Sequence, residues 1–336
     1  MLTQWGEKLD KDNVLPEYPR PQMRRTSFIN LNGLWDYAFT AAGEKQPDKW
    51  DGKILVPFSP ECELSGVGRV LSPDEYLWYR RDWAKPDFAE GDRVILHFGA
   101  VDQSCTVYIN GLRAFRHRGG YLPFEFDATG FLSKDVNEIS LSVRDVSDTS
   151  YHSRGKQRLK RGGIWYTPQS GIWQTVWAEC IPHDCIRQLH ITPDFDKACV
   201  NVRADTVGDS RAYAIFDGRQ YQLPASIPVP DFEPWSPENP KLYDFTVTCG
   251  EDRVESYFAM RKFSVEADSE GVKRLFLNGR PYFHNGLLDQ GYWSDGMYTA
   301  PSDEALIFDI QTAKDMGFNM LRKHIKIEPL RWYYHC

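Results

Sequence analysis

The sequence lacks any long apolar segment, and its longest apolar runs are only a few residues long. A transmembrane helix needs about 20 consecutive apolar residues, so a membrane-spanning helix is excluded. The first residues, Met1–Lys8, also lack the basic start and the apolar stretch of a secretory signal. We therefore expect a cytoplasmic protein without a membrane partner, or a periplasmic or secreted one if a signal lies upstream of Met1.

The sequence also has a deficit of positive charge and lacks the cysteine and histidine spacing of a metal site. The chain carries 40 Lys and Arg against 47 Asp and Glu, which gives a formal net charge of −7. An acidic surface repels phosphate backbones, so nucleic acid is not an expected partner. The seven cysteines are scattered, without a Cys-x-x-Cys pair or a Cys/His cluster at zinc spacing. We expect reduced thiols and no metal site.

Aromatic residues, in contrast, are plentiful, with 11 Trp, 17 Tyr and 19 Phe. This core material excludes disorder as the main state, and the length predicts two to three domains. A polar, proline-marked arm with a basic pair at Arg24-Arg25 comes first. Apolar and polar residues then alternate in Arg93–Phe98 and in Asn137–Val143, and Asn110-Gly111 is a strong hairpin signal. Residues 1–182 are predicted to form an antiparallel β-sandwich.

Residues 183–265 form a second predicted β region. A proline-crowded loop interrupts it, and about 80 residues of short strands suit a small immunoglobulin-like sandwich. The expected strands are Ile186–Ile191, Ala198–Ala204, Arg211–Phe216 and Tyr243–Thr248.

The pattern changes again in residues 266–336. An Asn-Gly hairpin at Leu275–Arg280 precedes a predicted strand, Pro281–Leu288, and Ser302 is a candidate N-cap for the helix that follows. Leu306, Ile310 and Ala313 repeat at helical spacing and Gly317 suits the helix end. A second strand, Phe318–Ile325, and a helix opening at Glu328-Pro329 complete a βαβα unit with parallel strands.

This unit is too short to be complete. A closed (β/α)₈ barrel needs about 250 residues, many more than residues 266–336 supply. We therefore expect the chain to be part of a larger enzyme whose barrel begins here. A non-catalytic carbohydrate-binding β-sandwich protein and a structural, adhesive β-sandwich pair are the alternatives, although neither has a use for a βαβα unit.

Seven motifs in the same order give the chain a family resemblance. They are Trp78-Tyr79-Arg80-Arg81, Val107–Gly111, His117–Thr129, Gly171–Trp177, Trp235–Tyr243, Phe258–Phe263 and Gly317–Arg322. In this order the sequence resembles glycoside hydrolase family 2, the β-galactosidase, β-glucuronidase and β-mannosidase group. The resemblance implies a mostly β chain: a jelly-roll-like sugar-binding sandwich, an immunoglobulin-like sandwich, then the start of a (β/α)₈ barrel.

The resemblance also implies a retaining β-glycosidase that acts on an oligosaccharide or β-glycoside. Such an enzyme uses two carboxylates about 5 Å apart and needs no cofactor. In the family both are glutamates on barrel strands 4 and 7, so they are expected beyond Cys336. No catalytic residue is assigned within this chain, which alone is predicted to be inactive. Family members are often oligomers, so a homo-oligomer is an open expectation.

The substrate-binding residues implied by the resemblance are Arg322, Asn319, His324, Asp289 and Trp165. Arg322 and Asn319 match a strand-2 position at the bottom of the family's sugar pocket, where arginine can orient a carboxylate. A structural ion pair is the alternative for Arg322, and an ordinary packed histidine is the alternative for His324. Asp289 either accepts from a sugar hydroxyl or caps a turn. Trp165 either stacks on a sugar ring or packs in the core.

Three further charged residues lie near these positions. Lys323 and Lys326 could touch substrate, but we expect solvated charges. Glu328 stands at a helix start, and the sequence shows no partner for it.

Overall fold

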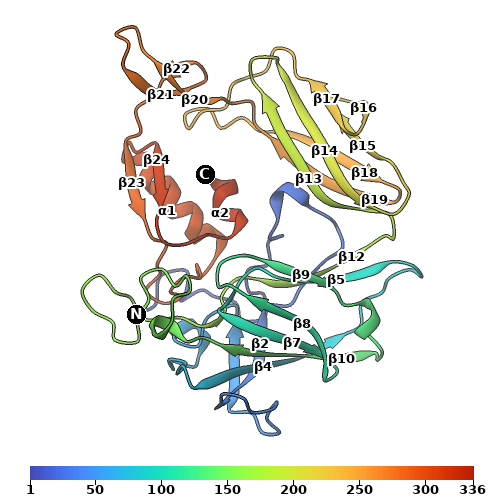
Figure 1. Ribbon diagram of the computed structural model, residues 1–336, viewed down its shortest axis with the longest axis vertical. Coiled ribbons are helices and arrows are strands. Elements are labelled where there is room, and N and C mark those ends of the chain that lie inside the picture. Colours follow the sequence, from blue (N-terminus) through green and yellow to red (C-terminus); the bar gives the residue numbers. More distant parts are fainter.

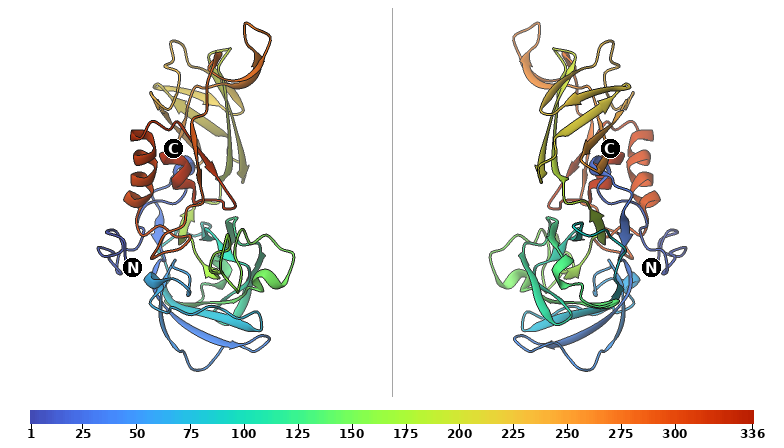
Figure 2. Two further views of the ribbon diagram at one scale, coloured as in Figure 1. Left: turned by 90° about the vertical axis from the view of Figure 1, so that its left-hand side faces the viewer. Right: turned by 90° about the vertical axis from the view of Figure 1, so that its right-hand side faces the viewer.

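The computed structural model describes residues 1–336 and consists mostly of β-strands with two α-helices (Figure 1). Two β-sandwiches follow one another along the long axis of the molecule, and a small α/β unit lies beside them (Figures 1 and 2). Neither helix is long and apolar enough to cross a bilayer. The predicted mostly β fold class is confirmed.

The first sandwich contains a six-stranded antiparallel sheet, β3-β2-β4-β10-β7-β8, and a four-stranded one, β1-β12-β5-β9, while β11 pairs with β6. The Asn110-Gly111 turn joins β7 to β8, as predicted. The strands are β1 (Phe28–Asn30), β2 (Gly33–Ala41), β3 (Gly52–Val56), β4 (Glu75–Ala84), β5 (Arg93–Phe98), β6 (Val101–Asp102), β7 (Ser104–Ile109), β8 (Leu112–Arg118), β9 (Phe124–Asp127), β10 (Val136–Arg144), β11 (Gly171–Ile172) and β12 (Val176–Ile181). The 3₁₀ turns are η2 (Glu63–Ser65), η3 (Thr129–Phe131) and η4 (Ser147–Thr149).

The core of this sandwich lies between the two sheets. The alternating residues of β5 and β10 that the sequence places inward are fully buried there, with Trp35 and Tyr79 beside them. The outer face of the four-stranded sheet is covered too, because His97 stacks on Trp177 with ring centroids 3.8 Å apart. Hydrophobic burial on both faces of β5 explains why nearly the whole strand is shielded from solvent.

The N-terminal arm joins the two sandwiches. It includes η1 (Pro21–Met23) and passes between them (Figure 1). Arg25 is buried: its Nε and Nη2 donate to Asp252, each over 2.8 Å, and Nη1 donates to Glu179 over 3.1 Å. Glu179 belongs to the first sandwich and Asp252 to the second, so one guanidinium bridges them. The basic pair Arg24-Arg25 is therefore not simply a surface patch.

The second sandwich contains the sheets β13-β14-β17 and β16-β15-β18-β19. The four strands expected from the sequence are confirmed. The division into domains at residues 182 and 265 stays a prediction. The strands are β13 (Cys185–Asp194), β14 (Cys199–Val207), β15 (Ala212–Phe216), β16 (Arg219–Gln222), β17 (Ala225–Pro228), β18 (Tyr243–Cys249) and β19 (Asp252–Phe258).

The third part begins with an exposed hairpin, β20-β21-β22, and continues as β23, α1, β24 and α2. The elements are β20 (Phe263–Ala267), β21 (Lys273–Leu277), β22 (Arg280–Pro281), β23 (Gly286–Asp289), α1 (Asp303–Asp315), β24 (Met320–Lys323) and α2 (Leu330–His335). β23 and β24 are parallel, which confirms the predicted βαβα unit. The first strand starts later than predicted, because Pro281 pairs with Phe276 in the hairpin. The second is also shorter than expected, with Ile325 at a positive φ of 59°.

The helix signals of this unit are confirmed. The Ser302 side chain accepts from the backbone N–H of Ala305, and Gly317 follows the helix with a φ of +88°. Leu306 and Ala313 are buried, and Leu306 packs in a cluster that includes Trp293, Trp332 and Leu321 of β24. This packing places the carboxyl ends of β23 and β24 beside the first sandwich (Figure 1).

Candidate functional site

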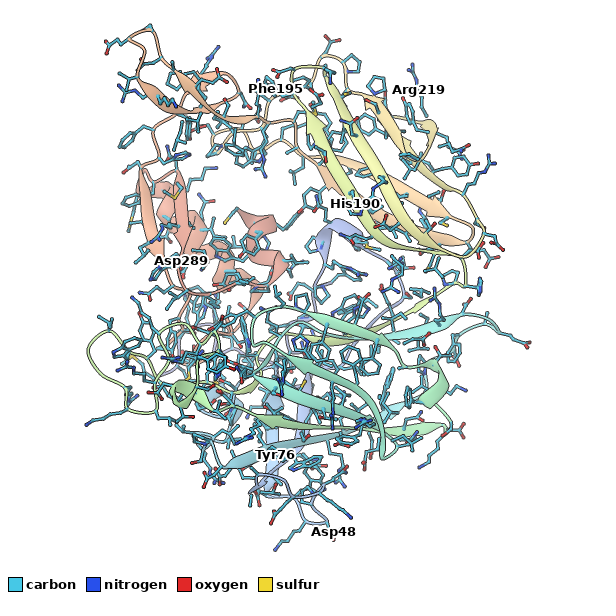
Figure 3. All side chains as sticks on the ribbon, in the orientation of Figure 1. Asp48, Tyr76, His190, Phe195, Arg219 and Asp289 are labelled. Atoms are coloured by element: carbon cyan, nitrogen blue, oxygen red, sulfur yellow. The ribbon has the colours of Figure 1, made fainter.

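The carboxyl ends of β23 and β24 meet at one edge of the α/β unit. Asp289 ends β23, Lys323 ends β24, and the two are paired in register. Asp289 is labelled at this edge in Figure 3. Functional side chains of parallel α/β folds gather at such an edge, so the site is described from here.

A buried network of ion pairs occupies this edge. Lys323 Nζ donates to Asp289 Oδ2 and to Glu328 Oε1, each over 2.7 Å, and Lys326 Nζ lies 3.0 Å from Glu328 Oε1. The side chains of Lys326 and Glu328 are 0% and 2% exposed. The expectation of solvated lysines is wrong, and Glu328 has two partners. Burial without pairing would be prohibitively unfavourable for these charges, so the four groups hold one another in place.

Lys326 also ties the α/β unit to the first sandwich. Its ammonium donates to the backbone carbonyls of Gly291 and Tyr298, over 2.7 and 2.6 Å. The ammonium lies 5.6 Å from the ring centroid of Trp173, which belongs to the first sandwich. Burial lowers the pKa of Lys326, and the adjacent Glu328 carboxylate opposes that shift. The charge therefore sits in an aromatic, hydrogen-bonded cage at the junction of two parts of the chain.

The loop of residues 150–170 leaves the first sandwich and packs onto the same edge. Tyr166 stacks on Tyr292 with ring centroids 4.6 Å apart, and the Tyr292 hydroxyl donates to the carbonyl of Thr167. Gly155, at a φ of +59°, allows the close approach: a Cβ there would lie 2.8 Å from the Tyr298 hydroxyl and 2.9 Å from the Ile325 carbonyl oxygen. The loop is thus fitted closely to the segments that follow β23 and β24.

Buried polar groups anchor the base of this loop. Gln169 Oε1 accepts from Ser59 Oγ over 3.3 Å and from the backbone N–H of Tyr298 over 3.0 Å, which links sandwich and α/β unit. The Ser170 N–H donates to Glu61 over 3.1 Å. Burial raises the pKa of the Glu61 carboxyl to about 8, and the nearby Asp145 carboxylate contributes to the rise. The loop is therefore held firmly at its base.

Trp165 lies half-buried in this loop. The guanidinium carbon of Arg158 stands 3.9 Å from its ring centroid. Trp165 belongs to none of the chain's apolar clusters, so the core-packing alternative does not describe it. One ring face is occupied by a cation. Its sugar-stacking role stays a prediction.

Arg322 and His324 lie close together at the site. Arg322 Nη1 is 3.5 Å from His324 Nδ1, and the backbone N–H of His324 donates to the backbone carbonyl of Asp289. Arg322 is exposed and has no carboxylate partner, so a structural ion pair is not formed. It lies on the face of Leu288, opposite the face on which Leu321 packs toward the helices. Burial lowers the His324 pKa, with Lys156 and Arg322 adding to the effect, so the imidazole is neutral at pH 7.

Asn319 lies at the other end of β24. Its Oδ1 accepts from the Asn285 N–H and its Nδ2 donates to the Phe283 carbonyl, each over 2.9 Å. These bonds fix the starts of the two parallel strands. The structure therefore brings Asp289, Arg322 and His324 together and leaves Asn319 apart, and substrate contact by any of them stays a prediction.

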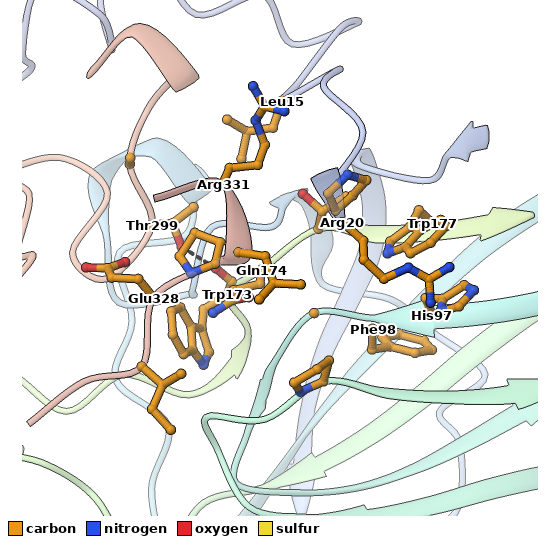
Figure 4. A pocket seen from close by; sticks show the side chains of 18 of the residues that line it. Leu15, Arg20, His97, Phe98, Trp173, Gln174, Trp177, Thr299, Glu328 and Arg331 are labelled. Carbon is orange, nitrogen blue, oxygen red and sulfur yellow. Dashed lines mark hydrogen bonds between the residues drawn. The ribbon is translucent and has the colours of Figure 1, made fainter. Parts of the chain in front are cut away.

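A separate cavity of about 350 Å³ opens beside the buried network, between the N-terminal arm, the first sandwich and the start of α2 (Figure 4). Aromatic residues line it, among them Trp173 and Phe98. Most of its charged groups are already paired: Arg331 holds Asp303 through two hydrogen bonds of 2.6 Å, and Arg20 donates to Glu179 over 2.8 Å, whereas Glu17 has no ion pair. Apolar walls and satisfied charges make it a packing space and a poor site for a sugar.

Sequence reasoning named Lys326 and Glu328 but did not predict that they pair in a buried network. It gave no structural part to Gly155, which is one glycine among 25. The one available signal was three charges, Lys323, Lys326 and Glu328, crowded behind a parallel strand. In the chain as a whole, no group of three His, Cys, Asp or Glu side chains is arranged to hold a metal ion.

Known proteins match the chain along most of its length. The family model for the sugar binding domain of glycosyl hydrolases family 2 matches residues 69–177, and the model "Glycosyl hydrolases family 2" matches residues 208–261. A β-galactosidase of Streptococcus thermophilus is 23% identical over 97% of this chain and 32% of its own length. A putative β-glucuronidase of Formosa agariphila is 25% identical over 82% of this chain and 34% of its own length.

Solved structures share the fold. The β-glucuronidase of Faecalibacterium prausnitzii superposes with a TM-score of 0.77 at 21% identity, over 95% of this chain and 59% of that one. The β-glucuronidase of Ruminococcus gnavus in complex with D-glucuronic acid gives 0.76 at 17% identity, over 96% and 60%. The chain spans about a third of the length of the curated relatives it matches. Two consecutive family models, in the order that the fold requires, together with these relatives, support glycoside hydrolase family 2 as the family of this chain.

Proposed function

We propose that this chain forms the sugar-binding, immunoglobulin-like and first barrel portions of a retaining β-glycosidase, and that the edge formed by β23, β24 and the loop 150–170 binds the sugar. One observation carries the proposal: a loop of the sugar-binding sandwich is built onto the carboxyl ends of the barrel strands, through the Tyr166–Tyr292 stack and the close approach at Gly155. Such an arrangement makes the sandwich a wall of a site centred on the barrel.

The exposed groups at this edge suit recognition of a polar ligand. Arg322 offers unpaired donors, neutral His324 can donate or accept, and Trp165 offers an aromatic surface for sugar C–H groups. The β-galactosidase and β-glucuronidase relatives support a β-glycoside as substrate.

Cleavage needs more than this edge contributes. A retaining mechanism uses one carboxyl as nucleophile and one as acid/base. Asp289 and Glu328 are the carboxylates here, and both are bound by Lys323. Glu328 is also bound by Lys326 and buried. The residues of this edge therefore bind and orient substrate, and the proposed catalytic pair lies elsewhere in the enzyme.

Equilibrium binding tests this proposal on the 336-residue chain. Phenyl 1-thio-β-D-galactoside and phenyl 1-thio-β-D-glucuronide resist cleavage and can be titrated by calorimetry. We expect one of them to bind, and Trp165→Ala to weaken binding about tenfold, since aromatic stacking is worth about 1 kcal/mol or more. Trp50→Ala is the matched control, because the Arg80 guanidinium covers Trp50 at 4.6 Å on a remote part of the sandwich. Equal effects of the two variants, or no binding, would contradict the proposal.

A further inference from the structure

Three arginines line a hollow on the outer face of the six-stranded sheet. Arg144 comes from β10, while Arg116 and Arg118 come from the edge strand β8. The strand between them, β7, contributes Ser104 and Thr106. The register aligns these side chains in rows, because Ser104 pairs with both Arg144 and Arg118, and Thr106 pairs with Arg116.

These guanidinium groups have no counter-charge. No carboxylate oxygen lies within 4.0 Å of any of the three, and the one hydrogen bond among them runs from Arg144 Nε to the Pro73 carbonyl, over 3.3 Å. All three arginines are exposed. Arginines such as Arg25 and Arg331 are bound to carboxylates, and the unpaired Arg219 and Arg322 belong to other parts of the chain, so this hollow differs in having three unpaired arginines together. In a chain of net charge −7, three unpaired cations around one hollow form a local site for an anion.

The hollow has the size and chemistry of a ligand site. Its volume is about 560 Å³, and hydroxyl-bearing residues, Ser104, Thr106, Ser142 and Tyr76, lie between and beside the arginines. Figure 3 labels Tyr76 on β4, at the face of the sandwich away from the α/β unit. Arg144 and Arg118 stand two strands apart, about 10 Å between their backbones at the usual strand spacing. A hollow of this width has room for a ligand that carries more than one anionic group.

We propose that this groove binds an anionic oligosaccharide, whose carboxylate or sulfate groups pair with Arg116, Arg118 and Arg144 while its hydroxyls meet Ser104 and Thr106. Guanidinium groups bind planar carboxylates and sulfates through charge-assisted hydrogen bonds. The hydroxyls between the cations favour a ligand that carries hydroxyls between its charges. The choice of a saccharide rests on the proposed function, whereas the anion binding does not.

The groove is separate from the candidate site. It lies on the sheet that contains β4, β7, β8 and β10, whereas the N-terminal arm and the second sandwich cover the other sheet (Figure 1). A charged polysaccharide bound in this groove would lie on the sandwich and would not enter the edge formed by β23, β24 and the loop 150–170. The groove therefore adds a substrate-anchoring surface to the protein.

Calorimetry with defined oligosaccharides tests the groove on the 336-residue chain. The probes are tetragalacturonate for carboxylate, a heparin-derived tetrasaccharide for sulfate, and cellotetraose as the neutral reference. We expect one anionic probe to bind with an affinity that falls with added salt, and cellotetraose not to bind. Arg118→Gln and Arg144→Gln should each weaken binding about tenfold, the effect of one charge-assisted pair.

Arg219→Gln is the matched control, because Arg219 is exposed and unpaired on β16 of the second sandwich (Figure 3). The proposal is overturned if neither anionic probe binds, if cellotetraose binds equally well, or if Arg219→Gln weakens binding as much. Tighter binding of single-stranded DNA with the same arginine dependence would instead identify a phosphate-binding surface. Trp165→Ala should leave binding of the anionic probes to the groove unchanged. Failure of the proposed sugar site at β23 and β24 can therefore be distinguished from failure of the groove proposal.

Discussion

Replacing Lys326 by methionine is expected to loosen the junction between the α/β unit and the first sandwich. Methionine keeps the apolar stem and removes the ammonium that binds Glu328 and the carbonyls of Gly291 and Tyr298. Removing one partner of a buried ion pair costs about 3–5 kcal/mol. Lys323 still binds Glu328, so we expect the lower end, about 3 kcal/mol.

Urea unfolding followed by tryptophan fluorescence measures this loss. A loss of this size lowers the midpoint by about 1 M urea if the slope is about 3 kcal/mol/M. Lys49→Met, at an exposed lysine without an ion pair, is the control. Adding Glu328→Gln should restore part of the stability, since the buried carboxylate that has lost one of its two cations is then replaced by a neutral group. A midpoint for Lys326→Met within error of the Lys49→Met value would refute the reasoning.

Three further predictions concern activity, pH and loop packing. The 336-residue chain should not hydrolyse nitrophenyl β-galactoside or β-glucuronide, because the carboxylates at the barrel edge are bound by Lys323; nitrophenol release by a preparation free of host galactosidase would contradict this. Glu61, with its pKa raised to about 8, keeps its proton when folded and loses it when unfolded, so stability should fall as pH rises from about 4.5 to 8. Urea unfolding at pH 5 and pH 8 should show this, and Glu61→Gln should flatten the dependence. Gly155→Ala should weaken thioglycoside binding more than Gly163→Ala, which has the same φ of +59° but open space at Cβ.

Local patterns explain how much of the fold could be predicted. The Asn110-Gly111 turn, the alternation in β10 and the Ser302 cap depend on neighbouring residues, and each was confirmed. The predicted strand limits were less accurate. Pro281 pairs with Phe276 in a hairpin, and the local sequence does not specify that pairing. Signals from neighbouring residues therefore predict where helices, strands and turns form, but they predict poorly which strands pair with one another.

The candidate site was harder to predict for the same reason. Lys326 looks like a solvated charge in the sequence, since its burial arises from Trp173, 153 positions earlier in the chain, and from Tyr298. The Tyr166–Tyr292 stack joins residues 126 positions apart. The family resemblance pointed to the ends of β23 and β24, but it could not show which side chains there are already bound by others.

The bridge made by Arg25 has a consequence for the order in which the protein forms during synthesis. Arg25 leaves the ribosome early, while Asp252 is 227 positions later in the chain. Until the second sandwich emerges and folds, the guanidinium has Glu179 as its nearest available carboxylate and no partner for its other donors. The Arg25 part of the arm can therefore complete its contacts only after both sandwiches exist, although it is translated before either of them.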